Sequence, residues 1–252
     1  MDINTYLTRI VYHGNVQPDL QTLKELQKQH LLHVPFENLD IHYHTPIRLN
    51  TDAIYRKVVE RKRGGFCYEL NGLFLELLTA IGFETRRISG RVYNGKTSAF
   101  GQEYDHLAVV VILDDREYLV DVGLGEFAFA PLMIDLNTVQ QDVRGNYVIR
   151  EYDTEYLIVY NLDGKNETPK YIFKNIHREY EEFSAMCNYH QSSPESPFTK
   201  NKLVSLPTEN GRISLTDDKL KATENGHTSE TTIADKAAFE AKLREIFGIT
   251  VP

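Results

Sequence analysis

The sequence predicts an α+β fold, with helices in the first third of the chain and an antiparallel sheet or small barrel in the middle. Up to Gly82, leucine and other apolar residues recur at helical spacing. From Glu84 the chain changes to short runs of β-branched and aromatic residues, which turn-forming residues separate at close intervals. A last amphipathic helix near the C-terminus completes the pattern.

The helices of the first third are predicted from this periodicity at 18–34, 50–65 and 67–82. Each begins near a residue that favours a helix start, and its apolar residues return every three or four positions. Gly64 and Gly82 are expected to end the second and third of these helices, because glycine readily adopts the left-handed conformation that follows a helix.

The strands that follow are expected to pair through short turns. Turn-forming residues predict these turns at 114–116, 153–154 and 163–164. After a Ser/Pro-rich connector at 189–201, the short segments LVSL and RISL are expected to be strands. The last helix is predicted to begin after Asp235, its N-cap, and to end at Gly248.

Composition and charge indicate a soluble globular protein of the cytoplasm. The 252 residues are 41% hydrophobic and 25% charged, and no apolar run reaches the length of a membrane helix. The polar start is unlike a secretory signal peptide. A net charge of −8 with no long basic stripe argues against nucleic acid as a partner. Cys67 and Cys187 are expected to be free thiols rather than a disulfide.

Cys67 stands where a helix is expected to begin, directly after Gly64, Gly65 and Phe66. Unpaired N–H groups at a helix N-terminus stabilise a thiolate, which is the form of cysteine that attacks a carbonyl. Glycines let the turn tighten and let a substrate approach the backbone. An inert packing thiol is the competing interpretation, and position alone does not decide between the two. A nucleophile also needs a base nearby.

A base and a carboxylate are expected on neighbouring strands. His106 begins a strongly apolar strand, and Asp121 lies near the end of the next one. If the strands pair through the turn at 114–116, the two side chains lie almost opposite one another, within a residue or two of register. An aspartate that orients an imidazole beside a helix-start thiol makes a Cys-His-Asp arrangement. Taken singly, each residue also has a purely structural interpretation.

A resemblance to the arylamine N-acetyltransferase family supports this arrangement. The segment RGGFCYELN at 63–71 resembles the active-site signature of that family. Other segments that agree with the family in order and spacing are VPFENLD at 34–40, DHLAVVV at 105–111, VDVGLGEFAFAPL at 120–132 and the late segment EFSAMCNYHQSSPESPFTKN at 182–201. The rest of the C-terminal part matches only in general character.

The resemblance implies an architecture of three regions around a cysteine-protease-like core. They are an N-terminal helical bundle (1–83) that carries the nucleophile, a central antiparallel β-barrel (84–190) that carries the histidine and the aspartate, and a C-terminal α/β lid (191–252). The catalytic triad of the family falls on Cys67, His106 and Asp121, with no change of residue type.

The resemblance also implies an acetyl-CoA-dependent acyltransferase that needs no metal. In the implied ping-pong reaction, Cys67 takes the acetyl group from acetyl-CoA and passes it to an arylamine, arylhydrazine or N-hydroxyarylamine, while His106 handles the proton. The partners are then small molecules, and neither nucleic acid nor membrane. The backbone N–H of Tyr68 is expected to support the oxyanion, and Glu37 and Arg63 to form a structural ion pair.

Residues that contact the two substrates are expected around this triad. By resemblance, Phe36, Val92 and Leu124 line the acceptor pocket, with core packing as the alternative. The glycines of the loop at 123–125 could present N–H groups to a phosphate, with a simple tight turn as the alternative. The predicted CoA contacts are Gly123, Gly125, Tyr189, Ser192 and Ser196, and the candidates for local positive charge are Lys96, Lys200 and Lys202.

Other functions are compatible with the same residues. A cysteine peptidase or a transglutaminase-like acyltransferase also begins with thiolate attack on a carbonyl, so the triad alone does not separate these enzymes. A peptidase would need an extended groove. A catalytically silent module that binds CoA or an aromatic ligand is a further alternative, against which an intact triad argues. An amide synthase that closes a large ring is a variation on the same fold.

Overall fold

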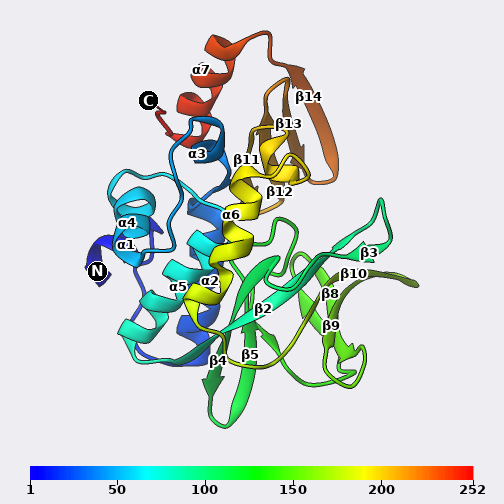
Figure 1. The fold of residues 1–252 in the computed structure, drawn as a ribbon. Helices are drawn as coiled ribbons and strands as arrows, with labels where there is room; N and C mark the ends of the chain where they lie inside the picture. Colours follow the sequence, from blue (N-terminus) through cyan, green and yellow to red (C-terminus); the bar gives the residue numbers. More distant parts are fainter. Residues whose placement is uncertain (252) are drawn as a thin grey trace.

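The computed structural model describes residues 1–251 and confirms the α+β fold (Figure 1). Helices fill the first third of the chain, and a barrel-like antiparallel sheet follows. A second sheet with a last helix forms the C-terminal region, which lies at the top of Figure 1. Helix α6 (Ser184–Ser192), drawn in yellow, precedes this region and runs between the N-terminal helices and the barrel in this view.

Helix α5 (Cys67–Ile81) is the centre of the helical region, and most of its residues are buried. It contacts other helices of this region as well as strands of the barrel. The neighbouring elements are α1 (Ile3–Arg9), α2 (Leu20–His33), β1 (Phe36–Glu37), α3 (Leu39–His42) and α4 (Thr51–Tyr55). The helices predicted at 18–34 and 67–82 are confirmed: Asp19 caps α2, and Gly82 ends α5 with a φ of 110°.

The helix predicted at 50–65 is only partly right. After α4 the chain makes a π-helical turn, η1 (Arg56–Glu60), and then leaves the helix. Gly64 therefore does not end a helix. A Cβ at Gly64 would lie 2.0 Å from the backbone oxygen of Pro35, so the glycine is required by the close approach of two chain segments.

The middle of the chain forms one antiparallel sheet in the order β6-β5-β4-β2-β10-β9-β8-β7. The amide side chain of Gln140 bonds the backbone N–H and oxygen of Met133 at 2.7 and 2.8 Å, so the two edge strands nearly close the sheet into a barrel. The strands are β2 (Glu84–Asn94), β3 (Ala99–Phe100), which pairs with β2, β4 (His106–Leu113), β5 (Arg116–Val120), β6 (Leu132–Met133), β7 (Gln140–Asp142), β8 (Gly145–Glu151), β9 (Leu157–Asp163) and β10 (Asn166–Phe173).

The hairpin predicted at 114–116 is confirmed. Leu113 of β4 lies opposite Arg116 of β5, so Asp114 and Asp115 form the turn with φ values of 50° and 58°. Two such residues in the left-handed region make the kind of turn whose twist matches a hairpin. The pairing continues to Val120, and the chain then leaves the strand at the next residue.

The C-terminal region is a second antiparallel sheet, in the order β1-β11-β12-β13-β14. Because β1 comes from the first third, its pairing with β11 ties the helical region to this sheet. The predicted strands LVSL and RISL and the last helix are confirmed. The elements are η2 (Tyr180–Phe183), α6 (Ser184–Ser192), η3 (Pro197–Thr199), β11 (Leu203–Thr208), β12 (Gly211–Thr216), β13 (Lys219–Glu224), β14 (His227–Thr232) and α7 (Lys236–Phe247).

The hairpin of β13 and β14 was not among the predicted elements. Asn225 and Gly226 form its turn with φ values of 48° and 80°, and Asn-Gly is itself a strong hairpin signal. However, β14 is exposed along its whole length, so its sequence lacks the apolar alternation that identifies a strand.

Strand β4 separates two of the apolar cores. Val109 and Val111 pack into the core of the helical region, whereas Ala108 and Val110 pack into the barrel interior. A strand buried on both faces explains why HLAVVVIL is apolar without alternation. A third core lies between α7 and the C-terminal sheet. Within residues 1–251, no helix has both the length and the apolar character needed to span a bilayer.

Candidate active site

Cys67 is the first residue of α5 and is 4% exposed. The preceding residue, Phe66, is extended (φ −98°, ψ −178°), and its backbone N–H donates to Oε2 of Glu69 at 3.2 Å. The capping interaction fixes where the helix starts. The thiol therefore lies at the positive end of a buried helix, where a thiolate is stabilised.

The segment after β5 passes directly over the nucleophile. A Cβ at Gly123 would lie 2.7 Å from the Cα of Cys67 and 2.7 Å from Nδ2 of Asn71. Neither the Cα nor the anchored amide can move away, so only glycine allows this approach. The close approach to Cys67 thus explains why residue 123 is a glycine, independently of any contact with a phosphate.

His106 and Asp121 meet beside Cys67. Nε2 of His106 lies 2.7 Å from Oδ2 of Asp121, and the two residues are only 2% and 0% exposed. His106 begins β4, and Asp121 directly follows β5. Because Asp121 occupies Nε2, Nδ1 is the ring nitrogen left to exchange a proton with the thiol. The structure therefore brings the three residues of the predicted triad together.

The surroundings of His106 favour its charged form. Burial alone disfavours an imidazolium, but the carboxylate of Asp121 and the Cys67 side chain outweigh it and raise the pKa of His106 from 6.5 to about 10. The ring therefore carries a proton at neutral pH. A neighbouring imidazolium and a helix N-terminus together stabilise a thiolate, so the arrangement can hold an activated nucleophile.

Asn71 holds the carboxylate in place and was not among the predicted site residues. Its Nδ2 donates to Oδ1 of Asp121 at 2.8 Å and to the backbone oxygen of Leu107 at 2.6 Å. Oδ1 of Asp121 also accepts from the N–H groups of Gly123 and Leu124, at 2.9 and 3.1 Å. Asn71 is fully buried one turn after the nucleophile. The same helix also carries Glu69 and Glu76, so the sequence alone did not single out Asn71.

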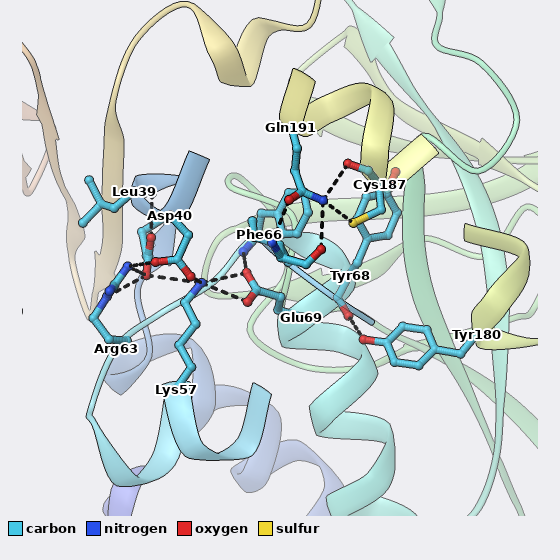
Figure 2. A network of polar contacts seen from close by, with 12 residues as sticks. Leu39, Asp40, Lys57, Arg63, Phe66, Tyr68, Glu69, Tyr180, Cys187 and Gln191 are labelled. Atoms are coloured by element: carbon cyan, nitrogen blue, oxygen red, sulfur yellow. Dashed lines mark hydrogen bonds and ion pairs between the residues drawn. The ribbon is translucent and has the colours of Figure 1, made fainter. Parts of the chain in front are cut away.

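A buried cluster of charges supports the start of α5 (Figure 2). Nζ of Lys57, on η1, lies 2.9 Å from Oε1 of Glu69 and 2.9 Å from Oδ2 of Asp40. Nη2 of Arg63 lies 2.8 Å from Asp40 and 2.8 Å from Glu37. The expected ion pair of Glu37 with Arg63 is therefore present, as part of a larger network. This network connects the π-helical turn η1, the loop that contains Arg63, and Glu69, which caps α5.

The charges of this cluster depend on one another. Burial raises the pKa of Glu69 to about 7, against the opposing influence of Lys57. Burial also disfavours the ammonium of Lys57, yet Glu37, Glu69 and Asp40 outweigh it and raise the pKa of Lys57. Lys57 is 4% exposed and must stay charged to balance the carboxylates. Lys57 lies within the π-helical turn η1, a kind of turn that often occurs at functional sites.

The three regions enclose a cleft of about 990 Å³ that reaches Cys67 and His106. Phe36, Val92 and Leu124, the predicted acceptor residues, all line it. Much of the remaining wall comes from the β2–β3 hairpin, the loop after β5, α6 and η3. The cleft is therefore wide enough for a ligand larger than an aromatic amine.

The residues predicted to contact CoA divide into two groups. Gly123, Gly125 and Tyr189 line the cleft. Ser192 and Ser196 are not among the described residues that line it. Oγ of Ser196 is fully buried and accepts from the N–H of Phe198 at 3.2 Å, and Ser192 bonds within its own helix. The structure thus gives both serines a local structural role at the end of α6.

Tyr68 and Cys187 pack behind the nucleophile. The hydroxyl of Tyr68 donates to the backbone oxygen of Tyr104 at 2.7 Å. The backbone N–H of Tyr68 lies in the first turn of α5, where N–H groups have no intrahelical acceptor. Cys187 is 2% exposed, and burial raises the pKa of its thiol to about 12. It is therefore inert at neutral pH. No group of three or more potential metal ligands occurs within residues 1–251.

Comparisons with known sequences agree with this geometry. A family model described as N-acetyltransferase matches residues 19–252. Arylamine N-acetyltransferase, pineal gland isozyme NAT-3, of Gallus gallus is 32% identical over 275 residues, which cover 100% of this chain and 95% of the relative. Arylamine N-acetyltransferase 1 of Homo sapiens is 32% identical over 278 residues, with the same coverage of 100% and 95%.

Comparisons with solved structures agree as well. The arylamine N-acetyltransferase of Mycobacterium marinum, solved in complex with CoA, is 30% identical with a TM-score of 0.89, over 98% of this chain and 93% of that one. An arylamine N-acetyltransferase of Bacillus cereus, reported with a Cys-His-Glu catalytic triad, is 28% identical with a TM-score of 0.92 over 100% of both chains. With this similarity along its whole length, the chain belongs to the arylamine N-acetyltransferase family.

Proposed function

We propose that this protein transfers an acetyl group from acetyl-CoA to an arylamine, arylhydrazine or N-hydroxyarylamine, through an acetyl-cysteine intermediate. The observation that carries the proposal is the buried 2.7 Å contact of His106 with Asp121, beside a cysteine at the start of α5 and open to one large cleft. The CoA bound to the Mycobacterium marinum relative supports the choice of donor.

The first half of the reaction acylates Cys67. The thiolate attacks the carbonyl carbon of the acetyl thioester, and the bond to the CoA sulfur breaks as the tetrahedral intermediate collapses. His106, held by Asp121, gives its proton to the departing CoA sulfur. The N–H of Tyr68 is proposed to donate to the oxyanion, since it has no intrahelical acceptor. The products are acetyl-Cys67, neutral His106 and free CoA.

The second half transfers the acetyl group to the amine. The neutral amine attacks the thioester carbonyl, and His106 accepts the proton that the nitrogen loses. Collapse of the intermediate breaks the bond between carbon and Sγ, which restores the thiolate and imidazolium. We propose that Phe36, Val92 and Leu124 form the apolar surface against which the aromatic ring lies, because all three line the cleft near the nucleophile.

We further propose that Gly123, Gly125 and Tyr189 contact the CoA donor, because all three line the cleft that Cys67 also lines. The proposed partners are small molecules alone. The proposed compartment is the reducing cytoplasm, in which Cys67 and Cys187 would stay as the free thiols that the structure shows.

An assay of CoA release tests the proposal. Purified protein is mixed with acetyl-CoA, with and without an aminosalicylate or a hydralazine-type hydrazine. We expect CoA release that depends on the amine, that is lost in Cys67→Ala, and that persists in Cys187→Ala, which removes the other thiol. If no amine causes CoA release although iodoacetamide still alkylates Cys67 rapidly, Cys67 is a reactive nucleophile but acetyl-CoA is not its donor. That result would reject the proposal.

A further inference from the structure

Arg212 lies on β12 and lines the same cleft as Cys67, on the wall contributed by the C-terminal sheet. Its Nη1 donates to Oγ of Ser205 at 2.7 Å, and its Nη2 donates to the backbone oxygen of Gly125. Its Nε is buried and has no hydrogen-bond partner. Both contacts are neutral, and in the described part of the chain no carboxylate pairs with this guanidinium.

The charge of Arg212 is therefore poorly compensated. Burial and the nearby Arg144, opposed by Glu126, lower its pKa to about 10, so the group stays charged at neutral pH. Arg144 is also held by neutral groups: it donates to the backbone oxygen of Gly211 at 2.9 Å and lies over the ring of Phe129. A half-buried cation without a counter-ion is costly, which indicates that an anionic ligand completes the site.

The lysines considered from the sequence are less well placed for that anion. Lys202 pairs with Asp217 and lies over the ring of Phe239. Lys200 is not among the described residues of the cleft wall, and Lys96 lines the cleft from the turn between β2 and β3 rather than from the C-terminal sheet. Arg212 is instead flanked in the wall by two hydroxyls, of Ser205 and Ser214, whose oxygens lie 2.8 Å apart.

We propose that Arg212, with Ser205 and Ser214, forms an anion subsite that binds a phosphate group of the CoA donor. A guanidinium offers several N–H donors in a planar arrangement that suits phosphate. The pair of serines can donate one further hydrogen bond, because one of their two hydroxyl protons is used between Ser205 and Ser214. This inference rests on the proposed function, because it assigns part of the same cleft to the same donor. Neither the acetyl group nor a neutral aromatic amine has a charge for this subsite, so it selects the donor and not the acceptor.

The test compares acyl donors that differ in their phosphates. Arg212→Gln is assayed with acetyl-CoA, with acetyl-dephospho-CoA, which lacks the 3′-phosphate, and with p-nitrophenyl acetate, which has no phosphate. We expect kcat/KM for acetyl-CoA to fall about 10- to 100-fold, as for loss of a charged hydrogen bond, and the p-nitrophenyl acetate rate to stay unchanged. Arg212→Lys keeps the charge and is expected to lose less.

The results with acetyl-dephospho-CoA show which phosphate group of CoA the subsite binds. A loss in Arg212→Gln that is equally large with acetyl-dephospho-CoA assigns the subsite to the diphosphate. A loss confined to acetyl-CoA assigns it to the 3′-phosphate. Either result supports the subsite.

A matched control removes the same charge elsewhere. Arg150 pairs with Glu167 at 2.6 Å on the barrel surface and lies outside the cleft, so Arg150→Gln should leave all three rates unchanged. An equal loss with p-nitrophenyl acetate in Arg212→Gln would show that Arg212 only supports the Gly125 loop, and no loss with any donor would reject the subsite. Wild-type protein that reacts with p-nitrophenyl acetate and not with acetyl-CoA would instead reject the proposed function.

Discussion

At the scale of single residues, the chemistry depends on how His106 is held. Asp121 receives hydrogen bonds from His106, Asn71, Gly123 and Leu124, so its position is fixed. A fully buried carboxylate that accepts this many hydrogen bonds cannot rotate away from the imidazole. The imidazole therefore has one orientation, with Nδ1 left for the proton of the thiol.

Asp121→Asn should preserve this geometry and remove most of the activity. The Asn oxygen can still accept from the two backbone N–H groups, but its NH₂ group then faces Nε2, which holds the proton on the wrong nitrogen. By analogy with the same change in Ser-His-Asp enzymes, we expect kcat to fall about 10³- to 10⁴-fold. Steady-state kinetics of acetyl transfer measure this, and a loss of only a few fold would contradict the role given to Asp121.

The same variant should change the pH dependence. Because the pKa of His106 is raised, the contribution of its imidazolium to folding is fully present below the ordinary pKa of 6.5. This contribution is lost as the pH rises through about 10, where the folded protein releases the proton. Without the carboxylate the pKa of His106 falls, so the alkaline decline of the residual activity should move to lower pH. An alkaline limb that stays in place would show that another group governs it.

The sequence contained enough to predict the three residues of the triad but not all of their supports. Helix-start position, strand-start position and hairpin register placed Cys67, His106 and Asp121 close together. Asn71 and Arg212 escaped prediction because their roles depend on contacts across distant segments, with Leu107 and Asp121 for the first and with Gly125 for the second. No local pattern distinguishes such residues from ordinary polar ones.

At the scale of elements, a cluster of buried charged side chains holds the start of α5 in place. Lys57 balances Glu69 and Asp40 at 2.9 Å from each, and Glu69 caps the helix that carries the nucleophile. Buried ion clusters add little net stability compared with apolar packing, but removing one partner leaves the others uncompensated. The cluster therefore acts mainly by fixing the position of the helix start.

Lys57→Met should destabilise the fold strongly. We expect the free energy of unfolding, measured in urea, to fall by about 3–5 kcal/mol, because the carboxylates lose their buried counter-ion. Adding Glu69→Gln to Lys57→Met should recover part of this loss. Lys24→Met, at an exposed position of α2, is the control and should change little. Stability equal to that of the wild type in Lys57→Met would contradict the account of the cluster.

The elements predicted well are those whose signals are local. Caps and apolar periodicity gave α2, α5 and α7, and turn residues gave the β4–β5 hairpin. The π-helical turn was missed because apolar periodicity does not distinguish a single π-turn from a regular helix. The β13–β14 hairpin was missed because an exposed sheet edge carries no apolar alternation.

At the scale of the whole molecule, the cleft exists only where the regions meet. Cys67 comes from the helical region, His106 from the barrel and Arg212 from the C-terminal sheet, and all three line one cavity. The short strand β1 pairs with β11 and so joins the first and last of these regions. The size of the cleft could not be predicted from the sequence, because it depends on how the regions pack.

The most direct test of the central claim is mass spectrometry of the protein after brief exposure to acetyl-CoA without an amine. We expect one added acetyl group, located on Cys67 by peptide mapping, and expect it to disappear when an arylamine is added, with the acetylated amine as the product. Absence of any adduct, an adduct on another residue, or an adduct that the amine does not remove would contradict transfer through acetyl-Cys67.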